Sequence, residues 1–309
     1  MRLLRPPPER PVTRFAPAPT GYLHLGHVVN AVYVWGLARA RGGTVILRIE
    51  DHDRQRCRPE YEREILNDIE WLGLEPDLGL PSEYRTGPCG FRQSDRGAAY
   101  RKELERLLAQ DLVFACDCSR KDLLAGAPPV RHAEIRYPGR CRSRGLAPAR
   151  GRGLRVIMEP GAERFEDLLR GPQIQDPSRQ CGDMPVRDRL GNWTYQFAVT
   201  VDDWRQGVTL VIRGQDLLAS TGRQIRLGRL LGRSEPPAFL HHPLILKDDG
   251  EKLSKANRDT GIRDLRAAGV APGEVLGRAV ELGGLGRGGS VGAAGLSDLV
   301  GSRLLGASR

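Results

Sequence analysis

The hydrophobic pattern near the N-terminus changes its period twice. Residues 12–16 form a short apolar run that predicts a buried strand, whereas residues 27–41 place apolar side chains at helical spacing and end in a basic turn. Gly42 and Gly43 predict the end of this helix. Residues 44–51 are again β-branched and apolar before two acids, as in a strand buried in a parallel sheet. This order of strand, helix and strand predicts an α/β fold with a doubly wound, Rossmann-type parallel sheet.

Further along the chain, regular and irregular stretches alternate. Amphipathic helices are predicted over residues 60–72 and 95–113. Between residues 114 and 190 apolar runs are short and Cys, Gly, Pro and Arg dominate, which predicts an insertion with its own small α+β fold. Residues 193–218 then contain two strand-like runs joined by a turn. A Gly-rich stretch after residue 262 predicts short helices and a disordered end.

These stretches define the expected organisation of the chain. The prolines near the N-terminus oppose a helix there and predict a loose tail. The expected boundaries are 1–11 for the tail, 12–113 and 191–246 for the two halves of the α/β domain, 114–190 for the insertion, and 247–309 for a polar loop and a short helical C-terminal region.

Charge and composition narrow the class of protein. The net charge of +10 favours a polyanionic partner such as nucleic acid, although an arginine-rich solvated surface would give the same value. No apolar run approaches the roughly 20 residues that cross a bilayer, and the first residues lack the apolar core of a signal peptide. We therefore expect a cytoplasmic, monomeric protein with no membrane partner. Six cysteines in 309 residues are too sparse for a disulfide scaffold.

The stretch RFAPAPTGYLHLGH, residues 14–27, joins the first predicted strand to the first predicted helix. In an α/β sheet this loop is a usual place for a ligand, and the start of the helix favours phosphate. Gly21 and Gly26 would let the backbone approach a ligand, and His24 and His27 could donate hydrogen bonds to a phosphate. The same histidines could instead bind a metal or be two surface side chains on a turn.

A second polar stretch, KDDGEKLSKA at residues 247–256, carries Lys252 and Lys255. Two ammonium groups on a loop can hold a triphosphate and neutralise the charge that develops on leaving pyrophosphate. By itself, the stretch is also typical of a solvated surface loop.

Together, the two stretches resemble the nucleotide motifs of class I aminoacyl-tRNA synthetases. HLGH is similar to the His-Ile-Gly-His motif of that class, and KLSKA to its Lys-Met-Ser-Lys-Ser loop, with Leu253 and Ala256 as departures. The first stretch together with LRIEDHD, YQFAVTVDD and VIRGQDLL resembles the glutamyl/glutaminyl branch over about residues 12–260. About fifty residues follow KLSKA, and we expect no anticodon-binding domain among them. In this respect the chain resembles the truncated glutamyl-queuosine tRNA(Asp) synthetases.

This resemblance implies a reaction. Such enzymes activate L-glutamate with ATP, which is used with Mg²⁺, to form glutamyl-adenylate. They then transfer glutamate to the queuosine base at the wobble position of tRNA(Asp), so the anticodon stem-loop is the implied partner. No general base is needed for the first step, because a carboxylate is already ionised at neutral pH.

The resemblance also implies roles for individual residues, each at a position that matches a motif of the family. Arg14 and Arg213 would face the substrate side chain, Glu50 would bind its ammonium group, and Tyr195 would add a hydroxyl and a wall. The family usually has Ser where this chain has Ala18, which removes one hydroxyl contact. The implied catalytic residues are His24, His27, Lys252 and Lys255; with Gly26 they bind ATP; the implied glutamate site is Arg14, Phe15, Ala16, Pro17, Ala18, Glu50, Tyr195 and Arg213.

Three of the cysteines, Cys116, Cys118 and Cys141, lie within one short segment. Their spacing indicates a structural zinc site, although a closed zinc site normally has four ligands and buried free cysteines would fit the same pattern. The resemblance implies Tyr137 as the fourth ligand, whereas His132 is the more common type of zinc ligand. We expect one zinc ion per chain, which would hold the fold of the insertion and take no part in catalysis.

Three other functions share part of this pattern. A short glutamyl-tRNA synthetase that charges tRNA 3′ ends would have nearly the same site residues. A catalytically inactive tRNA-binding relative would keep the fold, but the intact histidines and lysines oppose this. A nucleotidyltransferase could use the histidine motif on another substrate, whereas Arg14, Glu50, Tyr195 and Arg213 together favour an amino acid.

Overall fold

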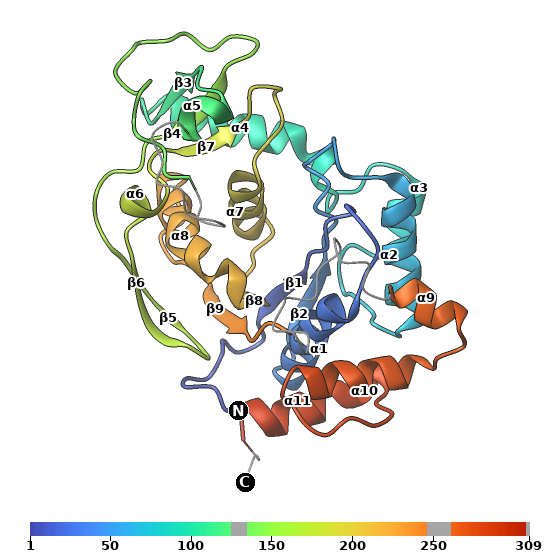
Figure 1. Cartoon of the computed structure of the whole chain (residues 1–309). Coiled ribbons are helices and arrows are strands. Elements are labelled where there is room, and N and C mark those ends of the chain that lie inside the picture. The colour runs from blue at the N-terminus through green and yellow to red at the C-terminus, as the bar shows by residue number, and fades with distance from the viewer. Residues whose placement is uncertain (125–134, 246–260, 307–309) are drawn as a thin grey trace.

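The computed structural model describes residues 1–124, 135–245 and 261–306 of the 309-residue chain. Strands and helices alternate along much of the chain (Figure 1). The strands are β1 Val12–Phe15, β2 Thr44–Leu47, β3 Val113–Cys116, β4 Gly153–Val156, β5 Glu163–Asp167, β6 Gly171–Gln175, β7 Met184–Arg187, β8 Leu210–Gly214 and β9 Ala238–His242. The helices are α1 Leu25–Ala40, α2 Pro59–Trp71, α3 Pro81–Thr86, α4 Gly97–Leu108, α5 Arg120–Leu124, α6 Pro177–Gln180, α7 Tyr195–Arg205, α8 Thr221–Leu230, α9 Ile262–Ala267, α10 Pro272–Leu282 and α11 Leu296–Leu304, with short 3₁₀ helices at Gln93–Arg96, Gln215–Ser220 and Ala293–Gly295.

The strands around the centre of the molecule pair mainly in parallel. β1 pairs with β2, and β9 pairs with both β8 and β5, whereas β5 and β6 form an antiparallel hairpin. β1 also lies beside β8, because the amide of Thr209 donates to the carbonyl of Val12 at 2.9 Å. The described strands nevertheless form separate sheets, and the hairpin makes one of them mixed. The α/β class is therefore confirmed, but the single doubly wound parallel sheet is not.

The run that begins at Tyr195 folds differently from the prediction. The sequence predicts a strand here, but Tyr195–Arg205 is helix α7. Phe197, Ala198 and Val201 lie fully buried in a hydrophobic cluster that also contains residues of α4. This helical spacing was hidden in a run rich in β-branched and aromatic residues, and tertiary packing decided the local structure. The next strand-like run is confirmed as β8.

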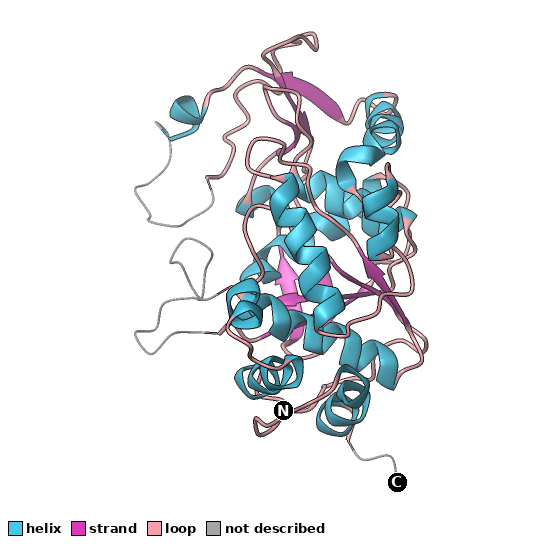
Figure 2. Ribbon diagram, turned by 90° about the vertical axis from the view of Figure 1, so that its right-hand side faces the viewer, coloured by secondary structure: helices cyan, strands magenta, loops and turns pink. Residues whose placement is uncertain are grey.

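The predicted insertion contributes to two sheets. β3, β4 and β7 form an antiparallel sheet at one end of the molecule, at the top of both Figure 1 and Figure 2. β5 and β6 also lie within residues 114–190, but they extend the sheet of β8 and β9. The division of the chain into domains stays a prediction.

Helix α1 packs in the middle of the main hydrophobic core. Val29, Val32 and Leu37 are fully buried, and both α10 and α11 pack against this helix. Gly36 permits the close approach of α11, because a Cβ atom there would lie 2.4 Å from Cγ2 of Val300. The C-terminal helices thus support the helix whose first residues carry the histidine motif. None of the helices in the described ranges is both long enough and apolar enough to cross a membrane.

Candidate active site

A cavity of about 340 Å³ opens between the N-terminus of α1 and the carboxyl ends of β1 and β8; we call it the central cavity. It collects residues that lie far apart in the sequence. Its walls are formed by Arg14, Ala16, His24, Gly26, His27, Asn30, Glu50, Tyr195, Ile212, Arg213, Gly214, Asp216, Leu217, His242, Pro243, Leu244 and Ile245.

The two histidines of the first motif are oriented by the backbone of the helix they precede. His24 is the N-cap residue of α1, and its Nδ1 atom accepts a hydrogen bond from the amide of Gly26 at 3.1 Å. Nδ1 of His27 accepts in turn from the amide of His24 at 3.1 Å. Because each Nδ1 is an acceptor, the proton of each neutral ring lies on Nε2, which makes it a donor. A Cβ atom at position 26 would lie 2.9 Å from Cε1 of His24, so any larger residue there would displace the His24 ring.

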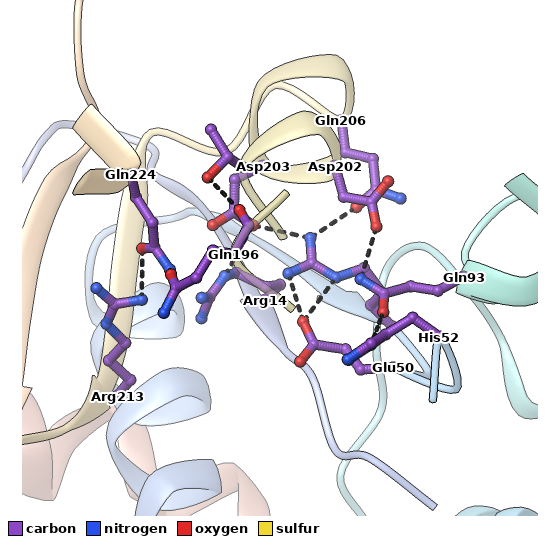
Figure 3. Close-up of polar contacts among 12 residues, drawn as sticks. Arg14, Glu50, His52, Gln93, Gln196, Asp202, Asp203, Gln206, Arg213 and Gln224 are labelled. Carbon is purple, nitrogen blue, oxygen red and sulfur yellow. Dashed lines mark hydrogen bonds and ion pairs between the residues drawn. The ribbon is translucent and has the colours of Figure 1, made fainter. Parts of the chain in front are cut away.

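One side of the central cavity is held by buried ion pairs, which Figure 3 shows. Nε of Arg14 and a terminal nitrogen of Arg48 both contact Oδ1 of Asp203, at 3.0 and 2.8 Å. A second nitrogen of Arg48 contacts Glu50 at 2.9 Å, and Arg48 is completely buried. Burial opposes the charged form of Asp203, but the two guanidinium groups lower its pKa below the ordinary value. The four side chains therefore form one charge-balanced network.

The opposite side of the cavity is formed by Arg213, which is buried. Its guanidinium donates to Gln224 at 2.7 Å, to the hydroxyl of Thr221 at 3.0 Å and to Nε2 of His241 at 3.0 Å. Figure 3 shows the contact with Gln224. Burial lowers the pKa of Arg213, and it raises the pKa of Tyr195 beside the cavity, so that phenol is neutral. Arg213 thus presents a buried cation held by neutral groups.

Of the other residues predicted to bind glutamate, not all line the central cavity. Ala16 lines the cavity, whereas Phe15 packs into the core against Trp35 at 5.5 Å between ring centroids. Pro17 and Ala18 are not among the lining residues; the carbonyl of Pro17 accepts from the amide of Glu50 at 3.0 Å. Lys252 and Lys255 lie outside the described residues.

Several residues at the cavity were missed by the sequence reasoning. Arg48 and Asp203 lie inside the LRIEDHD and YQFAVTVDD stretches, which carry the resemblance, but the resemblance implies no role for these two side chains. His242 lines the cavity, with Nε2 3.1 Å from the side-chain nitrogen Nδ2 of Asn30 and Nδ1 2.9 Å from the carbonyl oxygen of Pro243. Burial lowers the pKa of His242 to about 4, so its ring is neutral. The signal in the sequence that could have identified His242 is the pair of adjacent histidines before Pro243.

The three clustered cysteines come together at the end of β3. The Sγ atoms of Cys116, Cys118 and Cys141 lie within 4.8 Å of one another. The hydroxyl oxygen of Tyr137 lies 3.6 Å from Sγ of Cys116 and accepts from the amide of Cys141 at 2.8 Å. Burial and the neighbouring thiols raise the pKa of Cys118 to about 12, a cost that a bound cation would remove. Three sulfur atoms with one oxygen nearby fit a zinc site, while His132 lies outside the described residues.

A second cavity, of about 290 Å³, lies at the turns beside β4 and β7; we call it the insertion cavity. Four arginines line it, and none of them forms an ion pair with another residue that the structure describes. Their bonds go to carbonyl oxygens, such as that of Nε of Arg189 to Gly151 at 2.8 Å. Asp188 is the acid at this cavity, and it accepts from the backbone amides of its own turn. The arginines are Arg150, Arg152, Arg187 and Arg189.

Known proteins are similar to this chain in sequence and in fold. Residues 11–288 match the family described as tRNA synthetases class I (E and Q), catalytic domain. A protein named glutamyl-Q tRNA(Asp) synthetase from Nitratidesulfovibrio vulgaris is 42% identical over 286 residues, which cover 88% of this chain and 86% of that protein. Glutamate–tRNA ligase 1 from Alkalilimnicola ehrlichii is 40% identical over 88% of this chain, but only 56% of the ligase is covered.

A solved structure agrees with these sequence matches. A glutamate tRNA ligase from Elizabethkingia meningosepticum, in complex with its amino acid, superposes with a TM-score of 0.73 at 28% identity. The match covers 94% of this chain and 64% of the ligase, so this chain spans less than two thirds of that protein. The chain therefore belongs to the class I tRNA synthetases of the glutamate and glutamine group, a family of ligases.

Proposed function

We propose that this chain activates L-glutamate with ATP to form glutamyl-adenylate, and that it acts as a monomer in the cytoplasm. One observation carries the proposal: Arg213 is buried at the cavity wall and held by neutral groups. A buried cation without a carboxylate partner is costly until an anion reaches it. A ligand with an acidic side chain supplies that anion.

The other polar groups of the cavity fit the rest of an amino acid and a nucleotide. Glu50 lines the cavity, and the carboxylate oxygen that does not contact Arg48 suits the ammonium group. Arg14 is held in place by Asp203. His24 and His27 at the N-terminus of α1 suit the phosphates of ATP, with Mg²⁺ accompanying the nucleotide. Tyr195 remains a proposed wall of the glutamate site, and Lys252 and Lys255 remain proposed partners of the leaving pyrophosphate.

These groups define the first chemical step. The α-carboxylate of glutamate attacks the α-phosphorus of ATP, and the bond to the bridging oxygen breaks to release pyrophosphate. The cavity supplies hydrogen-bond donors and fixed charge rather than a general base. Nε2 of each motif histidine, as the protonated ring nitrogen, can donate to phosphate oxygens as their charge shifts.

We propose transfer to the queuosine base of tRNA(Asp) as the second step, in which a queuosine hydroxyl attacks the adenylate carbonyl and AMP leaves. The name of the 42% identical relative from Nitratidesulfovibrio vulgaris, 86% of which this chain covers, supports this choice. The arginines of the insertion cavity suit the phosphates of an anticodon stem-loop. A structural zinc ion held by Cys116, Cys118, Cys141 and Tyr137 would fix the end of β3 near this surface.

The test is transfer of labelled glutamate to full-length tRNA(Asp), with and without queuosine, and to full-length tRNA(Glu), followed by nuclease mapping of the label. Label in the anticodon fragment of the modified tRNA alone is the expected result. Label in the 3′ fragment of tRNA(Glu) would show a short glutamyl-tRNA synthetase instead, the alternative that the 40% identical ligase favours. Absence of glutamate-dependent ATP–pyrophosphate exchange would contradict activation itself.

A further inference from the structure

Arg213 is the start of a buried chain of hydrogen bonds that leads away from the central cavity. Its Nε–H group donates to Nε2 of His241 at 3.0 Å, and Nδ1 of His241 lies 2.6 Å from Oδ2 of Asp167. Both His241 and Asp167 are completely buried. Neither lines the central cavity, so neither belongs to the site as described so far.

The contacts fix the protonation of the imidazole. Nε2 of His241 must carry a lone pair, because it accepts from Arg213. The ring proton therefore lies on Nδ1 and is donated to Asp167. Burial lowers the pKa of His241, which keeps the ring neutral. If the proton moved to Nε2, two N–H groups would face each other, and Arg213 would have to turn away.

Asp167 is itself held firmly at the end of β5. Its Oδ1 atom accepts from the amides of Leu169 and Arg170 at 3.0 and 2.9 Å, and Oδ2 also accepts from the amide of His241 at 3.1 Å. The carboxylate thus joins β5 to β9 and presents a fixed acceptor to the imidazole.

We propose that Asp167 and His241 are positioning residues that aim Arg213 into the cavity and thereby select an acidic substrate side chain over its amide. The proposal rests on the proposed activation of glutamate. The imidazole of His241 lies between Asp167 and Arg213 and hydrogen-bonds to both, so Asp167 fixes the orientation of Arg213 through the ring. No carboxylate among the described residues contacts Arg213 directly. The positive charge of Arg213 stays available to the ligand.

The other arginine of the cavity shows what the spacer avoids. Arg14 contacts Asp203 directly at 3.0 Å, so its charge is balanced before any ligand arrives. If Arg213 touched Asp167 in the same way, glutamine and glutamate would meet a neutral ion pair and the site would lose much of its preference. The two arginines, which the sequence treats alike, thus have different tasks: Arg14 shapes the cavity and Arg213 discriminates.

The experiment compares His241→Leu with His241→Gln in ATP–pyrophosphate exchange, using glutamate and glutamine as substrates. Leucine removes the acceptor, whereas a glutamine side chain can again offer an oxygen to Arg213. We expect His241→Leu to raise KM for glutamate at least 100-fold, to change KM for ATP by less than 3-fold, and to lower the preference for glutamate over glutamine at least 10-fold. The kcat/KM for glutamate of His241→Gln should be at least 10-fold higher than that of His241→Leu.

A matched control separates positioning from general damage. Tyr84 is also buried and donates its hydroxyl to the carbonyl of Leu47 at 2.6 Å, outside the cavity lining. Tyr84→Phe should lower the melting temperature without changing the preference for glutamate. If His241→Leu folds and keeps that preference, or raises both KM values equally, the positioning role is wrong. If the wild-type protein shows no exchange with glutamate, the proposed function fails and the positioning role fails with it.

A second measurement needs no variant and therefore survives a failure of His241→Leu to fold. Nitrogen chemical shifts of the wild-type protein, labelled at histidine, distinguish a protonated ring nitrogen from a bare one. His241 should show a protonated Nδ1 and a bare Nε2 throughout pH 6 to 8. A protonated Nε2 would overturn the proposal, whatever the activity of the enzyme.

Discussion

The central cavity and the insertion cavity are both lined by arginines, but they hold them in opposite ways. Arg14 and Arg213 of the central cavity are 4% exposed and are held by buried side chains. Arg150 and Arg189 of the insertion cavity are exposed and bond, where they bond at all, to nearby carbonyl oxygens. The difference indicates a preorganised site for a small ligand in one case and an adaptable surface for a polyanion in the other.

The largest effect should come from breaking the buried charge network with Asp203→Asn. This substitution leaves Arg14 and Arg48 without the carboxylate that both contact. Two partly unpaired buried cations should cost about 3–5 kcal/mol in the free energy of unfolding, measured by urea denaturation. Arg189→Gln in the insertion cavity should cost less than about 0.5 kcal/mol. If both variants lowered the free energy of unfolding equally, the proposed difference between the central cavity and the insertion cavity would be wrong.

The burial of His242 at the wall of the central cavity also predicts a pH dependence of stability. His242 has a pKa of about 4 in the folded protein and 6.5 as the ordinary value, so the unfolded chain binds the extra proton between these pH values. The free energy of unfolding should therefore fall as pH is lowered from 6.5 to 4, by up to about 3 kcal/mol from this residue. His242→Gln should flatten that part of the curve in urea titrations. An unchanged slope would show that His242 is not the responsible group.

Metal removal tests whether a zinc ion stabilises the fold of the insertion without affecting activity at the central cavity. The purified protein should contain one zinc ion per chain, and Cys141→Ser should weaken zinc binding by about 100-fold, or about 2.7 kcal/mol. Because the cysteines lie at the end of β3 and outside the central cavity, glutamate-dependent exchange without tRNA should change by less than 3-fold. Zinc content and exchange rate are measured on the same sample. Loss of exchange in parallel with zinc would show that the two regions are coupled.

Sequence reasoning reached the parts of the site that depend on short motifs. His24, Gly26 and His27 act within one turn of helix, and local spacing was enough to place them at the start of α1. Cys116 and Cys141 were likewise grouped correctly, because the cysteines of one short segment do meet in space.

Contacts between residues far apart in the sequence could not be predicted in this way. Arg48 meets Asp203 across 155 residues, and Asp167 meets His241 across 74, so no local pattern connects them. Helix α7 was predicted as a strand because β-branched residues there obscured the spacing of its buried face. The resemblance supplied Arg14 and Arg213 but treated them alike, and only their different partners distinguish them.

The smallest effect concerns the insertion cavity, where exposed arginines bond to carbonyl oxygens of the surrounding turns. The double substitution Arg187→Gln and Arg189→Gln should weaken binding of tRNA by about 10-fold at moderate salt and reduce the slope of log affinity against log salt by about 1.5. Exchange with glutamate in the absence of tRNA should be unchanged. The control is Arg101→Gln with Arg287→Gln, which removes the same charge from exposed positions elsewhere. If both double variants weaken binding equally, the effect belongs to net charge, and the insertion cavity is no RNA surface.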